Sequence, residues 1–548
     1  MKCLKKVAIL TTIVSLFLSL FVLYTPKPKM SPDGFSAVRA LEHIEVISRE
    51  PHSVFDPVAH EAVRLYIKDT MTTYVGASNV YEYNYSKETL GEGTEYDIKN
   101  VLGVIPGESE IGIMLVGHYD SRGHIGRYGE LGRSYGAADD GYAIGTMLEI
   151  AHLYKDSNPK NSIYFLFTDA EETGLYGARM IATETALMDK IAFIINIEAR
   201  GVSGAAYMFE TSSNNQKVIE FYRKANLPVS YSLATAVYQV MPNFTDFTEF
   251  LAIDKQGINF AVLEGLSHYH TPLDNYQEVS VTSIQHYGEQ IEPLVKAFVA
   301  DARYGDVDYF VASQDSVFFT LFANVFISYS ETTANVLHIL TLVAFIAVLF
   351  WLFKQNAIDK TKILHYKSRF FMVFFVVIIL GYIYAQMMAL FGNTPFSLTY
   401  VRMDGSELPT LIFMIVLLVL GYKYYTEKVN TMEKMRAFLT FGIAFQLLIA
   451  LLTGFVLSGA SFLFFVPALL GVVALYVSSL KQKVLKHVVY GLTILVSILL
   501  IVPILYSFFL ALTVGGTPIL VALLFIHLTI LLPVFKLHLA LSDEGYDL

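Results

Sequence analysis

The sequence predicts an α/β domain, a three-layer sandwich with a mostly parallel central sheet, followed by an all-α multispanning transmembrane domain. Between about residues 30 and 315, short apolar runs rich in Val, Ile and Phe alternate with stretches of helical apolar spacing, as in buried parallel strands with covering helices. Beyond about residue 335, most of the chain consists of apolar stretches long enough to cross a bilayer. We therefore expect an N-terminal transmembrane anchor and linker at 1–29, a globular domain at 30–315 and a membrane domain at 316–548.

The elements of the globular domain follow from apolar spacing. Apolar residues at helical spacing predict helices at 35–48, 60–71, 143–154, 174–183 and 283–303. A Tyr-rich alternating stretch at 79–92 predicts an edge strand or hairpin, and 121–135 is a loop rich in Gly and Arg. Apolar runs predict strands at 100–105, 111–117, 161–168, 191–197 and 258–263.

The membrane part contains seven candidate spans. They lie at roughly 335–353, 370–390, 408–424, 437–457, 462–480, 487–507 and 517–535. A further apolar run at 7–24 follows three lysines and is either a cleaved signal peptide or an anchor. We favour the anchor, because the run is longer than a usual signal core and lacks an A-x-A site before Pro26. The count is then eight spans.

Basic residues predict the orientation of these spans. With the N-terminus inside, the Lys-rich loops at 354–369, 423–436 and 481–486 all fall on the cytoplasmic side, and only Arg402 falls in an outer loop. The globular domain is then extracytoplasmic. A single cysteine, Cys3, is ordinary for bacterial ectodomains and unusual for eukaryotic secretory ones, so we expect a bacterial plasma membrane, with a vacuolar or endoplasmic-reticulum membrane as the alternative.

Composition excludes some functions. The net charge is −10 without a basic stripe, so we expect no nucleic-acid partner. No charged residue lies well inside a predicted span, which argues against a transporter. The lipid bilayer is the one partner that composition predicts, and no pattern identifies a protein partner.

Polar residues of one chemical kind lie just after the predicted strands or before a helix. They are His118, Asp120, Asp139, Asp140, Glu171, Glu172, Glu198, His268 and His270. The carboxyl ends of parallel strands meet at one edge of a sheet, where ligands bind. Zinc accepts His nitrogen and carboxylate oxygen, and a pair of zinc ions needs a bridging carboxylate. The absence of cysteine ligands favours a hydrolytic site over a structural one.

Each motif alone has an ordinary explanation. Asp139-Asp140-Gly could cap a helix, Glu171-Glu172 could be a solvated turn, and His268 and His270 could be a surface pair. Their combination at successive strand ends favours one metal site. The residues alone do not separate Glu171 from Glu172, or His268 from His270, as the ligand.

The motif order HYD, AADDG, DAEETGLYGA, NIEARG and HYHTPLD resembles the co-catalytic di-zinc exopeptidases of clan MH, which include bacterial leucyl aminopeptidases and glutamate carboxypeptidase. The strings FETS at 209–212 and PNFTDF at 242–247, together with the membrane half, resemble the branch of vacuolar membrane proteases and endoplasmic-reticulum metallopeptidases. The resemblance covers roughly residues 35–300, and the membrane half by architecture only. It implies a zinc-dependent peptidase acting on peptide substrates.

The resemblance also implies roles for individual residues. One zinc would be held by His118, Asp139 and Glu198, and a second by Asp139, Glu172 and His270, with Asp139 bridging. Glu171 would be the general base, which takes a proton from the attacking water and delivers it to the leaving amine. Asp120 would accept the second ring N–H of His118, and Asp140 would follow Asp139 across a cis peptide. Glu198 departs from many soluble aminopeptidases, which have Asp at this position.

Three other functions compete with a di-zinc aminopeptidase. Relatives that serve as receptors or scaffolds lose ligands or the base, whereas this chain keeps competent residues at all six positions. Glutaminyl cyclisation on this fold uses a single zinc, and the full set argues against it.

The third alternative is a carboxypeptidase. Substrate contacts are expected from Arg200, Glu210, Asp246, His268 and Tyr269. Acids outnumber bases near the ligands, which favours an aminopeptidase. Arg200 as a carboxylate clamp would favour a carboxypeptidase instead.

Overall fold

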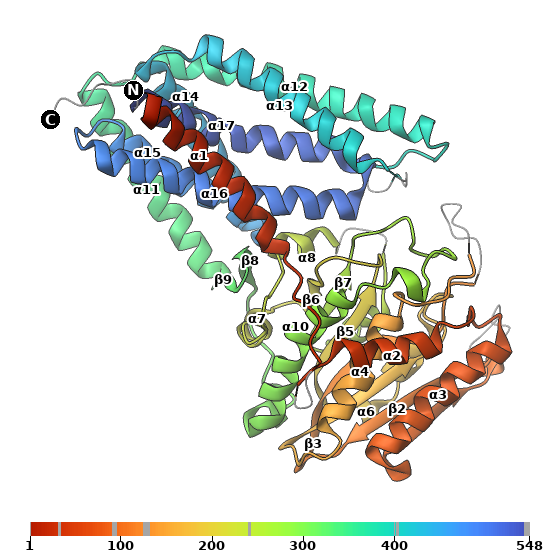
Figure 1. Ribbon diagram of the computed structural model, residues 1–548. Helices are drawn as coiled ribbons and strands as arrows, with labels where there is room; N and C mark the ends of the chain where they lie inside the picture. Colours follow the sequence, from red (N-terminus) through yellow and green to blue (C-terminus); the bar gives the residue numbers. More distant parts are fainter. Residues whose placement is uncertain are drawn as a thin grey trace. The chain divides into compact units, whose positions relative to one another are not determined.

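The computed structural model describes residues 2–30, 34–89, 96–123, 132–238, 243–398, 401 and 405–541. The chain forms two compact units, one from Tyr24–Phe319 and one from Met1–Leu23 together with Thr320–Leu548 (Figure 1). The sequence-based ranges 30–315 and 316–548 divide the chain near the same points. Arg402 and most of the loop at 121–135 lie outside the described residues.

A seven-stranded mixed sheet is the centre of the Tyr24–Phe319 unit. Its strands are β1 (Val80–Tyr85), β2 (Ile98–Ile105), β3 (Ser109–His118), β4 (Asn161–Thr168), β5 (Ile191–Ala199), β6 (Tyr207–Thr211) and β7 (Gly257–Val262). Their order is β1-β2-β4-β3-β5-β7-β6. The four central strands β4, β3, β5 and β7 are parallel, whereas β1, β2 and β6 pair antiparallel towards the two edges. The predicted α/β sandwich and the edge strand within 79–92 are confirmed.

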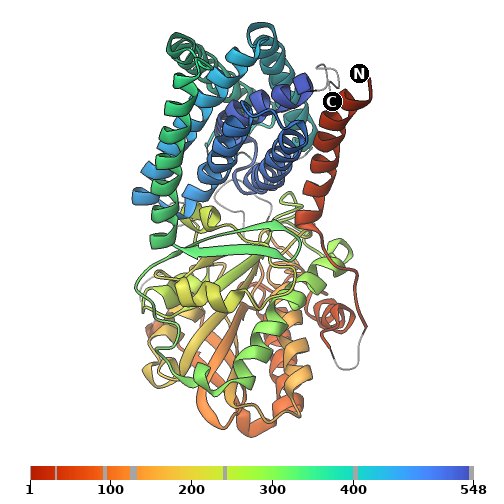
Figure 2. The same cartoon turned by 90° about the vertical axis from the view of Figure 1, so that its left-hand side faces the viewer.

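Helices cover both faces of this sheet (Figure 2). One face carries α2 (Ala37–Ile47), α3 (Pro57–Val75), α4 (Gly141–Tyr154) and α10 (Val281–Ala300). The other carries α5 (Tyr176–Ala182), α6 (Thr185–Met188) and α9 (Asp246–Leu251), which pack against β2, β3, β4 and β5. Two further helices are α7 (Gln216–Tyr222) and α8 (Ser232–Tyr238). Every residue of β4 and β5 is buried, because a parallel strand between two helical layers has no solvent-facing side.

The second unit is helical. Its helices are α1 (Lys2–Ser19), α11 (Glu331–Lys354), α12 (Lys360–Phe391), α13 (Glu407–Lys428), α14 (Met432–Val456), α15 (Ser461–Val477), α16 (Lys483–Leu512) and α17 (Thr517–Leu541). Within the part of the chain that the structure describes, seven helical segments, from Glu331–Lys354 to Val514–Leu541, are long and apolar enough to cross a membrane. Each contains or overlaps one predicted span. The shorter apolar helix over Val7–Leu23 packs along α16.

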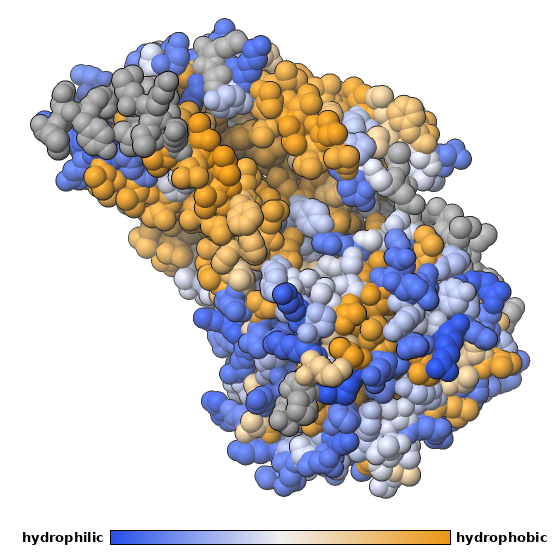
Figure 3. All heavy atoms as spheres, in the orientation of Figure 1, coloured by the Kyte–Doolittle hydropathy of each residue, from blue (hydrophilic) through white to orange (hydrophobic). Residues whose placement is uncertain are grey.

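The surface of the helical unit suits a bilayer. On the face shown in Figure 3, apolar side chains gather over this unit, while the Tyr24–Phe319 unit is mostly polar. Basic side chains at the predicted cytoplasmic side donate hydrogen bonds to backbone carbonyl groups at the carboxyl ends of helices. The Arg436 guanidinium donates to the carbonyl of Ser478 after α15, and Lys536 Nζ donates to the carbonyl of Val429 after α13. Cations are favourable at these negative ends of the helix dipole.

One pair of strands was not predicted. β8 (Ser316–Phe322) and β9 (Val325–Ser330) form a two-stranded sheet where the sequence analysis expected only the start of the membrane domain. Short 3₁₀ segments lie at Leu20–Leu23, Ala77–Asn79, Lys87–Thr89, Tyr276–Glu278, Ala302–Gly305, Ser458–Ala460 and Val514–Gly516.

Candidate metal centre

Strand ends bring the first candidate ligands together. His118 is the last residue of β3, and Glu198 lies near the end of the neighbouring parallel strand β5. Because Val116 is in register with Asn196, His118 and Glu198 are level and point to the same side of the sheet. Asp139 lies just before α4, whose N-cap is Asp140. The 139–140 peptide is cis, as the resemblance implies.

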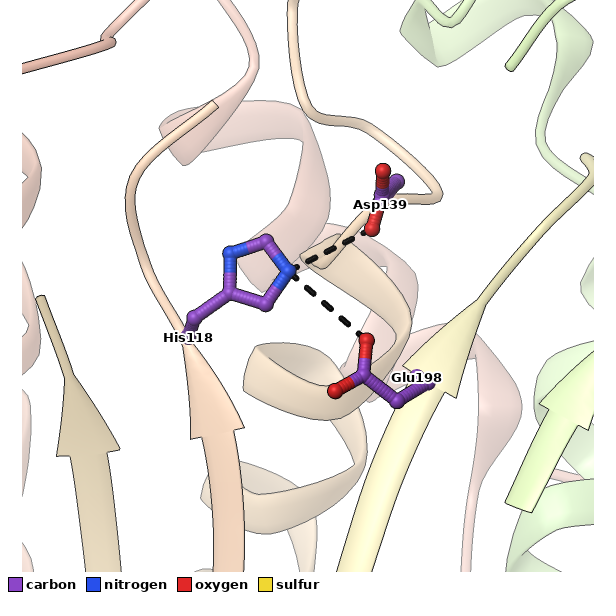
Figure 4. Close-up of side chains that lie close together, drawn as sticks. All are labelled: His118, Asp139 and Glu198. Atoms are coloured by element: carbon purple, nitrogen blue, oxygen red, sulfur yellow. Dashed lines mark ion pairs between the residues drawn. The ribbon is translucent and has the colours of Figure 1, made fainter. Parts of the chain in front are cut away.

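The first group consists of His118, Asp139 and Glu198, all buried (Figure 4). His118 Nε2 lies 3.3 Å from Asp139 Oδ1 and 3.8 Å from Glu198 Oε2. The imidazole and the two carboxylates thus converge on one point from two strands and a loop.

The second group consists of Asp139, Glu172 and His270. His270 Nε2 lies 3.2 Å from Asp139 Oδ2 and 3.2 Å from Glu172 Oε1. Glu172 follows β4, and His270 follows β7. Asp139 directs one oxygen to each group, which is the arrangement of a carboxylate that bridges two cations.

These residues fit divalent metal ions. Zinc–ligand distances of 2.0–2.1 Å in a tetrahedral site separate neighbouring ligand atoms by about 3.3 Å, close to most of the separations above. Among the described residues, Asp140 Oδ1 is buried without a hydrogen-bond partner, and Glu172 Oε1 is buried with only His270 Nε2 beside it, at 3.2 Å. An uncompensated buried carboxylate oxygen is costly, and a cation beside it removes that cost. The donor set of imidazoles and carboxylates suits zinc.

Asp120 acts differently from the expectation. His118 Nδ1 lies 2.8 Å from the main-chain oxygen of Asp120 but 3.6 Å from its carboxylate. The Asp120 carboxylate instead accepts the backbone N–H groups of Glu171 and Glu172, at 3.0 and 3.2 Å. The side chain therefore holds the turn that carries both glutamates, and the ring of His118 is oriented by a carbonyl.

The two adjacent glutamates occupy different surroundings. Glu172 belongs to the second group, whereas Glu171 belongs to neither. Burial raises the pKa of Glu171 well above its ordinary value, and the carboxylates of Glu198 and Glu172 add to this effect against the opposing charge of His118. A partly buried carboxyl with a raised pKa beside metal ligands is suited to proton transfer.

Residues that the sequence analysis did not assign hold the ligands in place. Arg122 Nη1 donates to Glu172 Oε2 at 3.1 Å. The Asp274 carboxylate accepts from Ser134 Oγ at 2.9 Å, Ala138 N at 2.7 Å and Asp139 N at 3.3 Å. Asp274 lies four residues after His270, so its hydrogen bonds connect the loop that carries His270 to the loop that carries Asp139. Its presence in the HTPLD motif was the available signal.

Three of the five expected substrate contacts, Tyr269, His268 and Arg200, follow the strands β5 and β7. Tyr269 stacks on His270 with ring centroids 3.6 Å apart, whereas His268 lies outside both groups, 3.5 Å from Glu278. Arg200 comes directly after β5, with Glu198 two residues earlier.

The remaining two expected contacts are buried acids. Burial raises the pKa of Asp246 to about 6, and its Oδ2 accepts a hydrogen bond from Thr168. Glu210 is buried on β6. The sequence analysis missed Tyr238. Burial raises the pKa of its phenol, and the nearby carboxylates of Glu210, Glu198 and Glu171 raise it further.

Residues 100–295 match the family model described as Peptidase family M28. This part of the chain is therefore similar to the peptidases of family M28. The matched range contains both candidate ligand groups and Glu171. The predicted resemblance to this peptidase family is thereby confirmed.

Curated relatives include the putative endoplasmic reticulum metallopeptidase 1 of Schizosaccharomyces pombe, 31% identical over 38% of this chain and 25% of that protein. The vacuolar membrane protease of Candida tropicalis is 25% identical over 55% of this chain and 33% of that protein. The matches thus span a quarter to a third of these relatives' length. Their names place them at the endoplasmic reticulum and the vacuole, so the expected bacterial plasma membrane is not supported.

Among solved structures, a Zn-dependent exopeptidase from Parabacteroides distasonis has 17% identity and a TM-score of 0.38, over 48% of this chain and 99% of that chain. A glutaminyl cyclase from an Acidobacteriales bacterium has 17% identity and a TM-score of 0.39, over 50% of this chain and 99% of that chain.

Proposed function

We propose that this protein is a membrane-anchored di-zinc exopeptidase that removes residues from the N-terminus of peptides on the extracytoplasmic side of its membrane. The observation that carries the proposal is the pair of ligand groups that share Asp139, with Glu171 beside them. A receptor or scaffold needs neither a complete ligand set nor a general base beside it.

Each residue then has a chemical task. His118, Asp139 and Glu198 would hold one zinc, and Asp139, Glu172 and His270 the other. Zinc bound there supplies Lewis-acid polarisation of the scissile carbonyl and lowers the pKa of water. Glu171 takes the proton of the attacking water and delivers it to the leaving amine. Asp120 fixes the turn that carries Glu171, and Asp274 fixes the backbone at Asp139.

The charge of the site favours a substrate ammonium group. Glu171, Glu198 and Asp246 lie in one neighbourhood, since Glu198 and Asp246 both raise the pKa of Glu171, and Asp246 raises the pKa of Glu198. Arg200 is the one base that the sequence analysis placed near the ligands. A carboxylate outside both ligand groups, such as that of Asp246, attracts a free N-terminus and repels a free C-terminal carboxylate.

We expect the purified full-length protein to cleave short peptides with a free N-terminus, and we expect N-acetylation or a zinc chelator to abolish cleavage. Mass spectrometry of the products identifies which end is shortened, and an N-terminal glutaminyl peptide in the panel tests cyclisation. Restoration of activity by added zinc is the control for the chelator. Efficient removal of C-terminal residues from N-acetylated peptides would contradict an aminopeptidase and assign Arg200 as a carboxylate clamp.

The proposed orientation has its own test. In a Cys3→Ser background, single cysteines at Ser313 and Ser458 are expected to react with a membrane-impermeant thiol reagent from the extracytoplasmic side. Cysteines at Asn356 and Thr431, both exposed, are expected to react only after permeabilisation. Sealed vesicles of known orientation provide the measurement. Reaction at Asn356 from the extracytoplasmic side would overturn the orientation of the whole helical unit.

A further inference from the structure

A β-bulge in β6 determines which way Glu210 points. Met208 pairs with Phe260, but the next paired residue is Glu210, opposite Asn259, so Phe209 is an extra residue in the strand. Without the bulge, Phe209 would lie opposite Asn259 and Glu210 would point to the other side of the sheet. The bulge therefore brings a carboxylate to the side of the sheet that carries Glu198, since Asn259 is in register with Asn196 on β5.

Buried amides connect Glu210 to the metal ligand Glu198. Asn196 Nδ2 donates to Glu198 Oε1 at 3.0 Å and to Asn259 Oδ1 at 3.1 Å. Asn259 Nδ2 in turn donates to Glu210 Oε2 at 3.0 Å. The two amides thus fix both carboxylates in one row across β5, β7 and β6. No donor to Glu210 Oε1 occurs among the described residues, and Glu210 keeps 5% exposure where both asparagines have none.

The separation along this row decides which part of a substrate reaches Glu210. β6 is the second strand from β5, so their backbones are about 10 Å apart. The substrate α-ammonium is attached next to the scissile carbonyl and must stay beside the metal ligands. Glu210 is too far along the row for that ammonium, but the four-carbon stem of a Lys side chain, or the similar reach of Arg, spans such a gap.

We propose that Glu210 is a specificity-determining residue of this site and selects substrates whose N-terminal residue is Lys or Arg. This inference rests on the proposed aminopeptidase function. Burial raises the pKa of Glu210 to about 7, against the hydrogen bond from Asn259, so an isolated carboxylate is unfavourable there. A Lys or Arg head group beside Glu210 compensates the ionised carboxylate and gains a charge-assisted hydrogen bond to Oε1.

The test compares wild type with Glu210→Gln, using the full-length protein and anilides of Lys, Arg, Leu and Glu. The wild type is expected to have its highest kcat/KM on Lys and Arg. Glu210→Gln is expected to lower kcat/KM for Lys and Arg by about 10–100-fold, the worth of a hydrogen bond to a charged group, and to leave Leu unchanged. Glu249→Gln is the matched control, because Glu249 pairs with Arg179 at the surface of α9.

The outcomes separate the inference from the proposed function. Equal rates of wild type on Lys and Leu, or an equal loss on all substrates in Glu210→Gln, would overturn the role of Glu210 while an aminopeptidase remains. Failure to cleave any free-amino anilide would refute both. If Glu210→Gln does not fold, Glu210→Asp retains the charge on a shorter stem, and a selective loss on Lys and Arg relative to Leu is the result that supports the inference.

Discussion

Glu171→Gln is expected to lose catalytic turnover by about 10²–10⁴-fold while it retains both metal ions. The substitution preserves the size of the side chain and removes its ability to accept a proton. Glu171 belongs to neither ligand group, so the two sites keep all their donors. Turnover on a free-amino peptide and elemental analysis of the same preparation provide the two measurements.

Glu172→Gln is the matched control, because it makes the same change at the adjacent residue. Glu172 Oε1 belongs to the second group, so this variant should lose metal as well as activity. Wild-type turnover in Glu171→Gln would exclude Glu171 as the base. Full metal content in Glu172→Gln would contradict the division of roles between the two glutamates.

The central fold was predictable because each central strand is covered on both faces. The runs at 161–168 and 191–197 are continuous and apolar, and they are the buried strands β4 and β5. The β8–β9 pair was missed because its apolar residues adjoin the first membrane helix and merge with its hydrophobic pattern. Antiparallel pairing at the edges depends on contacts between distant segments, which spacing along the chain does not encode.

The candidate ligands were predictable from chemistry and from strand ends. What spacing alone left open was the choice within each adjacent pair. Glu171 and Glu172 lie in one turn, whose orientation is fixed by the Asp120 carboxylate. That orientation decides which of the two side chains points to the second ligand group. His268 and His270 are separated by the chain reversal at 268–271, which places His268 beside Glu278 instead.

Other features of the site depend on tertiary hydrogen bonds. The Asp120 carboxylate has backbone N–H groups as partners 51 and 52 residues away, so the expected bond to the ring of His118 is replaced by a carbonyl contact. The direction of Glu210 depends on one inserted residue in β6, and strict alternation predicts the opposite side of the sheet. Such features need the fold before they can be assigned.

Asp139→Ala is expected to lose both metal ions. Asp139 Oδ1 lies 3.3 Å from His118 Nε2, and Asp139 Oδ2 lies 3.2 Å from His270 Nε2, so one carboxylate serves both groups. Its removal leaves each site with two protein ligands and withdraws the charge that offsets repulsion between two cations. Since the loss of partners that merely orient a ligand costs 10–100-fold in metal affinity, the loss of a shared ligand should exceed about 100-fold at both sites.

His118→Ala and His270→Ala provide the comparison for Asp139→Ala, because each removes a ligand from one group only. Each single histidine variant should therefore retain one tightly bound metal, measured by competition with a chromogenic chelator and by elemental analysis. Circular dichroism separates loss of a ligand from loss of the fold. β3 and α4 pack against each other, and the backbone N–H of His118 donates to the Asp140 carboxylate, and neither contact involves Asp139. Two tightly bound metals in folded Asp139→Ala would exclude a shared carboxylate, and the same metal loss in all three variants would indicate one cooperative site in place of two groups joined by a bridge.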